Sequence, residues 1–376
     1  MKYMGSKRAM LRNGLGQLLL QEATNHSRFF DLFCGSGAVA LFVATNVSVP
    51  VHAFDLQQYG RVLAGAVVER THVADYRRLW KNWRARASRR FARSLAVISP
   101  LPYPKTFSPR DIAGIRRWCS KAGSPLTEAY GGHYFSPLQA LWLDALRASI
   151  NEEQILELAA LLDAASECAA SPGHTAQPFQ PTDTARRHIS DAWSRDIVAK
   201  TGDALRKMSK LRAKISGTAS VVDANEAVKG VRGGDLVFVD PPYSALQYSR
   251  FYHVLESVVS GKPGPVEGVG RYPLSVLRPK SSYSVKSQAL NSIKSLLAEL
   301  SQRGATVILT FPDHECSNGL SGSIIKEISL KYFECSEVVV KSRFSTLGGT
   351  GPDCIVTEKR GARRNATELI LLLKPK

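Results

Sequence analysis

The sequence predicts an α/β protein: a Rossmann-like, mostly parallel sheet interrupted by a long and mostly helical insert. Short apolar segments that carry an acid at or near their end, at 29–33, 51–55 and 237–240, are typical of buried strands in such a sheet. A glycine-rich turn follows the first of them, as in nucleotide-binding α/β folds. From about residue 71 to about residue 215 the alternation of strands and helices stops. We therefore divide the chain into residues 1–70, 71–215 and 216–376.

The strand at 237–239 leads into a stiff acidic turn around which the rest of the chain is organised. Its three residues are apolar, and the prolines that follow end it because proline has no N–H for a strand ladder. The turn consists of Asp240, Pro241, Pro242 and Tyr243. An acid at the carboxyl end of a parallel strand lies where open α/β sheets bind their ligands. Asp-Pro-Pro alone favours a plain turn, whereas the whole tetrad after an apolar strand favours a catalytic motif.

The segments before and after residue 35 form a candidate cofactor site. Gly35 to Ala40 fits the Rossmann glycine fingerprint with alanine in the last place, and Asp55 ends the next strand, where an acid accepts ribose hydroxyls. Asp31 precedes the glycines and would repel the pyrophosphate of a dinucleotide, whereas S-adenosylmethionine carries a sulfonium and an ammonium. These residues favour S-adenosylmethionine over NAD. The alternative for Asp31 is a loop acid or a helix cap.

The charge of the chain predicts a polyanionic partner. Fifty Lys and Arg face 32 Asp and Glu, which gives a net charge of +18 and a pI near 9.8. Residues 71–125 alone hold 13 Lys and Arg against two acids, with aromatic residues between them. A solvated basic face is the simpler interpretation, but this density favours a nucleic-acid surface. The residues expected to contact DNA are Arg84, Arg86, Arg89, Arg90, Arg93, Arg116, Arg117, Lys210 and Arg250.

Strand and helix patterns resume after residue 215. Asp223 ends a strand and is followed by Ala224, so its carboxylate is a candidate partner of the cofactor's adenine, with a turn acid as the alternative. We expect a basic helix at 205–214, at the end of the insert, and then an amphipathic helix at 289–300 and a buried strand at 305–311. An antiparallel pair is expected at 337–341 and 368–373, with a polar glycine-rich segment at 342–351 between the two strands. Tyr248, Arg250 and Tyr252 are expected to contact bases or phosphates.

Together these motifs resemble the Dam-type DNA adenine-N6 methyltransferases, at both ends of the chain and in the same order. The opening stretch, with Tyr3 and Lys7, resembles a family motif that packs on the cofactor. Asp31, Phe33, Gly35 and Gly37 match the Asp-x-Phe-x-Gly-x-Gly loop, while Asp55, Asp223 and Ala224 lie where the family contacts ribose and adenine. Residues 71–215 match no motif securely. Ala224 replaces a common phenylalanine, so a stacking ring must come from elsewhere, such as Phe33.

The resemblance implies a class I S-adenosylmethionine methyltransferase fold with an inserted target-recognition domain. Asp240 and the Pro241 carbonyl would bind the amino group of an adenine flipped out of double-stranded DNA, and Tyr243 would stack on that base. Asp240 would also lie against the cofactor. The tetrad itself does not separate adenine N6 from cytosine N4, or DNA from RNA. A DNA-binding subunit of a defence complex that has lost catalysis remains a third possibility.

Other features limit the partners. No run of 18 apolar residues exists, and no apolar core of a signal peptide follows the first residues, so we expect a cytoplasmic protein located at the nucleoid through DNA. The six cysteines form no Cys-x-x-Cys pair, so no metal site is expected. A restriction or other defence partner is compatible with the sequence. A membrane-surface role is the weakest option, because the basic residues do not form one amphipathic helix.

Overall fold

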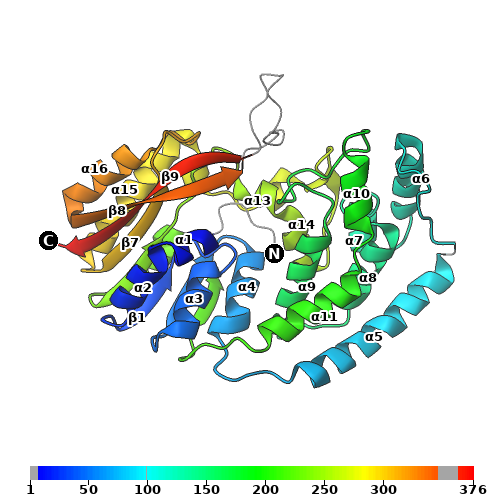
Figure 1. Ribbon diagram of the computed structural model, residues 1–376, viewed down its shortest axis with the longest axis horizontal. Helices are drawn as coiled ribbons and strands as arrows, with labels where there is room; N and C mark the ends of the chain where they lie inside the picture. Colours follow the sequence, from blue (N-terminus) through cyan, green and yellow to red (C-terminus); the bar gives the residue numbers. More distant parts are fainter. Residues whose placement is uncertain (1–6, 99, 346–362) are drawn as a thin grey trace.

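The computed structural model describes residues 7–98, 100–345 and 363–376, and a seven-stranded sheet forms its centre (Figure 1). The strands lie in the order β3-β2-β1-β4-β7-β9-β8. Their bounds are β1 (Arg28–Asp31), β2 (Val51–Asp55), β3 (Thr218–Val221), β4 (Asp235–Val239), β7 (Thr306–Pro312), β8 (Phe333–Ser345) and β9 (Arg363–Pro375). The first five are parallel to one another, and β9 runs antiparallel to both β7 and β8. The predicted α/β class is confirmed, as is the final antiparallel pair.

Side chains of alternate strand residues point to opposite faces of the sheet, and each face has its own helices. On one face, Phe29 and Phe238 pack with α1 (Arg8–Arg12), α2 (Leu15–Ala23) and α3 (Ala38–Asn46). On the other face, Phe30 and Val237 pack with α12 (Ala224–Ala227), α15 (Lys286–Gln302) and α16 (Gly322–Tyr332). Both faces are covered, so β4 is buried along its whole length, as the apolar residues 237–239 predict, and the buried Asp235 at its start pairs with Arg28.

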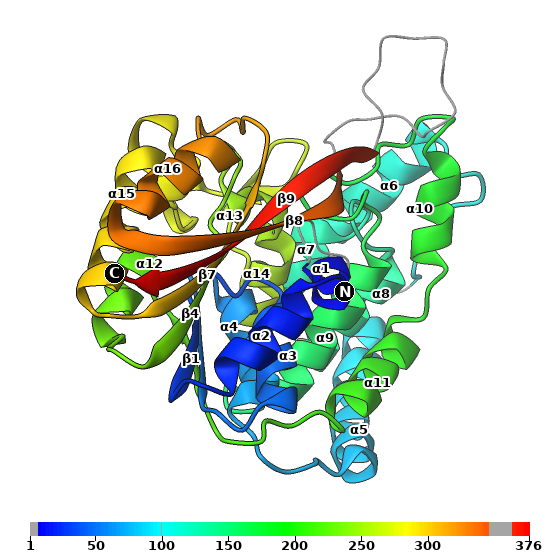
Figure 2. The same ribbon diagram turned by 60° about the vertical axis from the view of Figure 1, so that its left-hand side comes forward.

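Most of the remaining helices form a second part beside the sheet (Figures 1 and 2). They are α5 (Tyr76–Val97), α6 (Pro109–Cys119), α7 (Pro125–Tyr130), α8 (Pro137–Arg147), α9 (Ile155–Cys168), α10 (Arg186–Trp193) and α11 (Ile197–Met208). Their main core also contains side chains of α4 (Gln58–Val68) and of α14 (His253–Ser260), which lie outside residues 71–215 in sequence. α9 packs directly on α4, so the helical part is joined to the sheet through a shared apolar core.

The predicted basic helix at 205–214 is wrong in its second half, because α11 ends at Met208. The Arg70 guanidinium donates hydrogen bonds to the carbonyl oxygens of Met208 (3.1 Å) and Leu211 (2.7 Å). It thereby satisfies carbonyl groups that have no partner at a helix end, and the chain turns back toward β3. Lys210 therefore lies in a loop.

The segment from Tyr243 to β7 holds the short helix α13 (Tyr248–Phe251), α14, and a two-stranded hairpin of β5 (Val266–Glu267) and β6 (Tyr272–Pro273). It also contains the 3-10 turns η2 (Ser275–Leu277) and η3 (Ser282–Ser284), and η1 (Val228–Gly230) precedes β4. Within the part of the chain that the structure describes, no helix combines the length and the apolar character needed to cross a membrane.

Candidate active site

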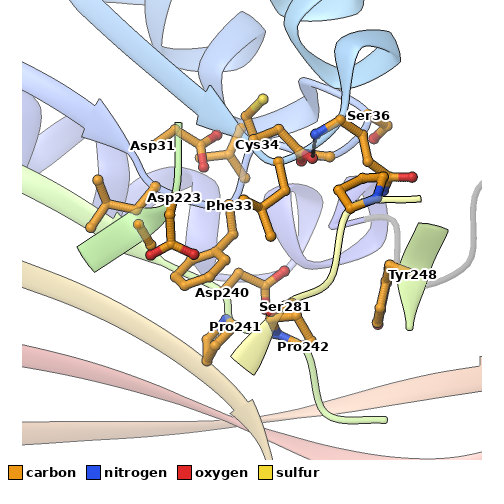
Figure 3. Close-up of a pocket in the computed structure, with 18 of the residues that line it drawn as sticks. Asp31, Phe33, Cys34, Ser36, Asp223, Asp240, Pro241, Pro242, Tyr248 and Ser281 are labelled. Atoms are coloured by element: carbon orange, nitrogen blue, oxygen red, sulfur yellow. Dashed lines mark hydrogen bonds between the residues drawn. The ribbon is translucent and has the colours of Figure 1, made fainter. Parts of the chain in front are cut away.

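A single cavity at the carboxyl edge of β1, β2, β3 and β4 brings the acidic turn and the glycine loop together (Figure 3). The parallel strands end at the same edge of the sheet, so residues far apart in sequence meet there. The predicted site residues that line this cavity are Lys7, Asp31, Phe33, Gly35, Asp55, Asp223, Ala224, Asp240, Pro241, Pro242 and Tyr243. Gly37 lies beside the cavity without lining it, and Tyr3 lies outside the described residues.

Asp240 follows the last residue of β4 and is held in a defined position. The Thr310 hydroxyl, on the neighbouring β7, donates a hydrogen bond of 2.9 Å to Asp240 Oδ1. Asn318 Nδ2 donates to the carbonyl oxygens of Pro242 (2.9 Å) and Tyr283 (3.0 Å), which ties the proline turn to the rest of the structure. Neither Thr310 nor Asn318 was predicted as a site residue. The position of Thr310 near the end of a buried strand was the only signal in the sequence.

Lys7 contacts the acidic turn directly. The sequence predicted it only as a cofactor-binding residue. Its Nζ lies 3.0 Å from Asp240 Oδ1 and 2.8 Å from Glu368 Oε2, on β9. Burial by itself lowers the pKa of Lys7, but the two carboxylates outweigh this effect and hold the pKa above its ordinary value. Burial raises the pKa of Asp240, and the Lys7 ammonium opposes that shift. Lys7 therefore stays charged and partly neutralises the negative charge of Asp240 and Glu368.

Asp31 ends β1 and is buried at the floor of the cavity, with 1% of its surface exposed. Its Oδ2 accepts a hydrogen bond of 3.2 Å from the Ala40 amide of α3, so it does contact the helix start, as the alternative interpretation proposed. Its Oδ1 has no hydrogen-bond partner among the described residues. Burial, followed by repulsion from Asp240, raises the pKa of Asp31 to about 8. A cationic group beside Oδ1 would reverse this shift.

The glycine loop and Asp55 form one hydrogen-bonded unit. Asp55 Oδ2 accepts from the Gly35 amide (2.8 Å), and Oδ1 accepts from the Gln57 amide (2.9 Å). Burial raises the pKa of Asp55 to about 6, while these backbone hydrogen bonds act against the shift. Each oxygen retains a lone pair for a hydroxyl donor.

Two glycines, one inside the fingerprint and one outside it, allow close packing around the cofactor loop. Gly37 has a φ of +73°, and a Cβ there would come within 3.3 Å of the Ala64 backbone, so this glycine permits both the turn and the close approach of α3 to α4. Gly60 at the start of α4 was not predicted, yet a Cβ on it would lie 2.9 Å from Asp55 Cγ and 3.0 Å from the Gly35 carbonyl oxygen.

Asp223 and Ala224 follow β3 and line the cavity, and the Asp223 side chain lies beside Phe33 (Figure 3). Asp223 Oδ1 accepts a hydrogen bond of 2.9 Å from the Asn225 amide and so begins α12. The Phe33 ring meets the edge of Tyr283, with 5.1 Å between ring centroids. Phe33 therefore supplies an aromatic ring to the cavity that Ala224 lacks.

The aromatic residues at the end of the tetrad and after it have different surroundings. The Tyr243 and Tyr248 rings are nearly perpendicular, with centroids 6.4 Å apart, and both line the cavity. Tyr252 is 1% exposed and packs against Tyr59, so the expectation that it contacts nucleic acid is wrong. The Arg250 guanidinium lies over the Tyr272 ring, 4.8 Å from its centroid.

The basic residues predicted to contact DNA do not gather around the cavity. Five of them, Arg84, Arg86, Arg89, Arg90 and Arg93, lie on α5, which packs on α8 and α11 at the outer side of the helical part (Figure 1). Of these five only Arg86 is half-buried, and its Nε donates to the Ser149 carbonyl. Arg116 is also half-buried and donates to the Gly132 carbonyl, whereas Arg117 and Lys210 are exposed. A DNA-binding role for them stays a prediction.

No group of three or more His, Cys, Asp or Glu side chains suited to a metal ion is found among the residues that the structure describes. The four acids of the cavity, Asp31, Asp55, Asp223 and Asp240, each lie at the end of a different strand rather than around one point.

A Rossmann-like sheet with an antiparallel final pair, a glycine loop after β1 and an Asp-Pro-Pro-Tyr turn after β4 define a class I methyltransferase fold. The chain belongs to the family of D12 class N6 adenine-specific DNA methyltransferases, because the sequence model of this family matches residues 3–310. Family membership accounts for the resemblance of both ends of the chain, and the match also spans residues 71–215, for which the sequence motifs alone were insufficient.

Several characterised methylases are similar to this chain. It is 24% identical to the modification methylase StsI of Streptococcus sanguinis over 80% of this chain and 42% of the relative. It is 27% identical to the type II methyltransferase M.NlaIII of Neisseria lactamica over 69% of each chain. It is 24% identical to the modification methylase LlaI of Lactococcus lactis subsp. lactis over 80% of this chain and 44% of the relative. The chain thus spans less than half the length of two of these relatives.

Proposed function

We propose that this chain transfers a methyl group from S-adenosylmethionine to the N6 amino group of adenine in double-stranded DNA. The observation that carries the proposal is the single cavity lined by both the Asp240–Tyr243 turn and the glycine loop with Asp31 and Asp55. A donor bound at the loop and a base bound at the turn would then be neighbours. The family match favours adenine over cytosine and DNA over RNA.

The charge of the cavity suits S-adenosylmethionine. Four carboxylates, those of Asp31, Asp55, Asp223 and Asp240, line it together with one ammonium, that of Lys7. The buried Asp31 Oδ1, which has no partner among the described residues, calls for a cationic or hydrogen-bonding donor. The sulfonium and the ammonium of this cofactor satisfy that need, and the pyrophosphate of a dinucleotide does not.

The residues of the acidic turn would position the target amine. When bound, S-adenosylmethionine would supply an electrophilic methyl group. Lys7 and Thr310 both engage Asp240 Oδ1, and we propose that Oδ2 accepts a hydrogen bond from the adenine amine. A second hydrogen bond to the Pro241 carbonyl would direct the nitrogen lone pair toward the methyl group, and Tyr243 would stack on the extruded base. The chain would act by positioning, without a covalent enzyme intermediate.

We also propose that residues 71–215 recognise the DNA target and that the protein serves as the modification member of a restriction–modification system. The helical part shares an apolar core with α4 and α14, and this packing beside the sheet supports the first proposal. The relatives named as modification methylases support the second proposal. DNA as substrate places the protein with the nucleoid in the cytoplasm.

The test is methyl transfer from labelled S-adenosylmethionine to DNA, followed by digestion and nucleoside analysis. We expect N6-methyladenine in a defined sequence context, and no product with the Asp240→Ala variant. N4-methylcytosine would establish the alternative base, and cofactor binding without transfer to any nucleic acid would establish a catalytically silent DNA-binding subunit. A persisting mark with Asp240→Ala would refute the role of the turn.

A further inference from the structure

A second cavity lies beside the candidate active site, between the start of α4, α14 and the segment that follows α14. The two cavities share three lining residues, Gln57, Ser249 and Pro279. These residues mark the place where the cavities meet. None of the three was expected to be functional, because no motif contains them.

Two of the three shared residues carry a buried polar side-chain atom that lacks a hydrogen-bond partner among the described residues. Gln57 is 5% exposed and Ser249 is 6% exposed. Gln57 Oε1 and Ser249 Oγ are buried, and neither has a hydrogen-bond partner among the described residues. Buried polar atoms in folded proteins are nearly always paired. Two such atoms, on residues that line the same junction, leave hydrogen-bonding capacity for a bound ligand group.

The elements that carry these two residues are clamped together. Gln57 is the residue before α4, and the two carboxylate oxygens of Glu256 on α14 accept hydrogen bonds from the Gln58 and Tyr59 amides, both at 3.0 Å. Ser249 lies on α13, seven residues before Glu256. Glu256 thus fixes the start of α4 against α14, the helix that follows the short helix carrying Ser249.

The donor and acceptor properties of the two side chains select the ligand group. Gln57 Oε1 can only accept a hydrogen bond, whereas a serine hydroxyl can donate or accept. A ligand hydroxyl satisfies both atoms, since it donates to Gln57 and accepts from Ser249. Asp55, whose Oδ1 accepts from the Gln57 amide, lies next to this junction and is the predicted acceptor for ribose hydroxyls.

We propose that Gln57 and Ser249 bind a ribose hydroxyl of S-adenosylmethionine beside Asp55. The proposal rests on the proposed function for the identity of the cofactor. Ser249 belongs to the same segment as Tyr248, whose ring contacts that of Tyr243. A ribose held by Ser249 therefore also stabilises the aromatic wall of the target-base site, so that cofactor binding prepares that site.

The test is isothermal titration of the full chain with S-adenosylhomocysteine and with its 2′-deoxy and 3′-deoxy analogues. For Gln57→Met and for Ser249→Ala, we expect about fivefold to tenfold weaker binding of S-adenosylhomocysteine, the effect of one hydrogen bond. For one of the two deoxy analogues, the variants and the unmodified protein should bind equally. The matched control is Gln58→Met, whose side chain is exposed and whose backbone bond to Glu256 is retained.

Unchanged affinity in both variants would overturn the inference. Equal losses for S-adenosylhomocysteine and for both deoxy analogues would also overturn it, since the effect would then come from the loop and not from a hydroxyl contact. The two substitutions lie on different elements, so one that disturbs folding in a thermal scan leaves the other to decide. Absence of binding by the unmodified protein would instead overturn the proposed function and its cofactor.

Discussion

The buried Lys7 ammonium lies between two half-buried carboxylates, 3.0 Å from Asp240 Oδ1 and 2.8 Å from Glu368 Oε2. Lys7 and Asp240 both line the candidate active site. The ion pair between them therefore keeps the Asp240 side chain in the cavity. The cavity is lined by four carboxylates and by the Lys7 ammonium, and this acidic lining favours a cationic methyl donor.

Replacing Lys7 by methionine should damage both stability and activity. The variant removes the ammonium that lies between the half-buried Asp240 and Glu368 carboxylates, and losing one partner of a largely buried ion pair costs about 3 kcal/mol of unfolding free energy. The pKa of Asp240 should rise further, so that more of it is protonated, and a neutral carboxyl group accepts a weaker hydrogen bond from the amine than a carboxylate does. We expect methyl transfer to fall by about 100-fold or more at neutral pH, measured at saturating DNA.

The pH dependence separates this effect from simple damage. The residual activity of Lys7→Met should increase with pH as Asp240 loses its proton, because the carboxylate is the active form. Glu368→Gln is the control, since it keeps the contact between Lys7 and Asp240 and should lower activity much less. Equal losses in the two variants would show that the trio acts only in folding.

The Asp31→Asn variant should be more stable than the unmodified protein in the absence of cofactor, and the difference in unfolding free energy should grow as pH increases. The folded-state pKa of Asp31 is raised to about 8, above the unfolded value of about 3.9, so the folded state keeps a proton that the unfolded chain loses. The carboxyl therefore lowers the unfolding free energy progressively between about pH 4 and pH 8. Relative to the unmodified protein, the variant should gain on the order of 2 to 5 kcal/mol across this range, measured by urea unfolding.

The same variant should bind S-adenosylmethionine more weakly, because the neutral amide cannot pair with a cation. A stability gain with lost binding would be typical of a strained binding site. If the unfolding curves of variant and parent instead stay parallel from pH 5 to pH 8, Asp31 does not titrate in this range.

Glu256→Gln should weaken cofactor binding through the start of α4. The carboxylate accepts from two backbone amides there, and a glutamine side chain can accept with only one oxygen. Loss of such a cap costs about 1 kcal/mol, and we expect the KM for S-adenosylmethionine to rise about fivefold while kcat changes less. The exposed Glu267→Gln, on β5, is the control. A fall in kcat with unchanged KM would place Glu256 elsewhere in the mechanism.

Replacing Arg89, Arg90 and Arg93 together by alanine tests whether the outer helix α5 contacts DNA. If each arginine neutralises one phosphate, the slope of log affinity against log salt should fall by about 2.7, at about 0.9 per contact. Cofactor affinity should stay constant, because α5 lies away from the cavity. Lys331→Ala on α16 is the control for a general change of charge. An unchanged salt slope would remove α5 from the DNA interface.

Much of the site could be predicted from the sequence because its parts are local. The burial of β4, the position of Asp240 after it and the turns at Gly35 and Gly37 follow from periodicity, proline chemistry and backbone conformation within a few residues. The parallel pairing of these strands then brings their ends together, so the cavity lined by Asp31 and Asp240 was also foreseen.

The contacts across the chain were decided only by the tertiary structure. Lys7 meets Glu368, 361 positions away in sequence, because β9 inserts beside β7, and no local pattern encodes that pairing. Gln57 and Ser249, far apart in sequence, line the same junction, which lies where Glu256 joins α14 to the start of α4. The basic residues of α5 were visible in the composition, but their distance from the cavity was not. Residue type and spacing determine which groups a segment offers, whereas side-chain packing between distant segments determines which of those groups meet.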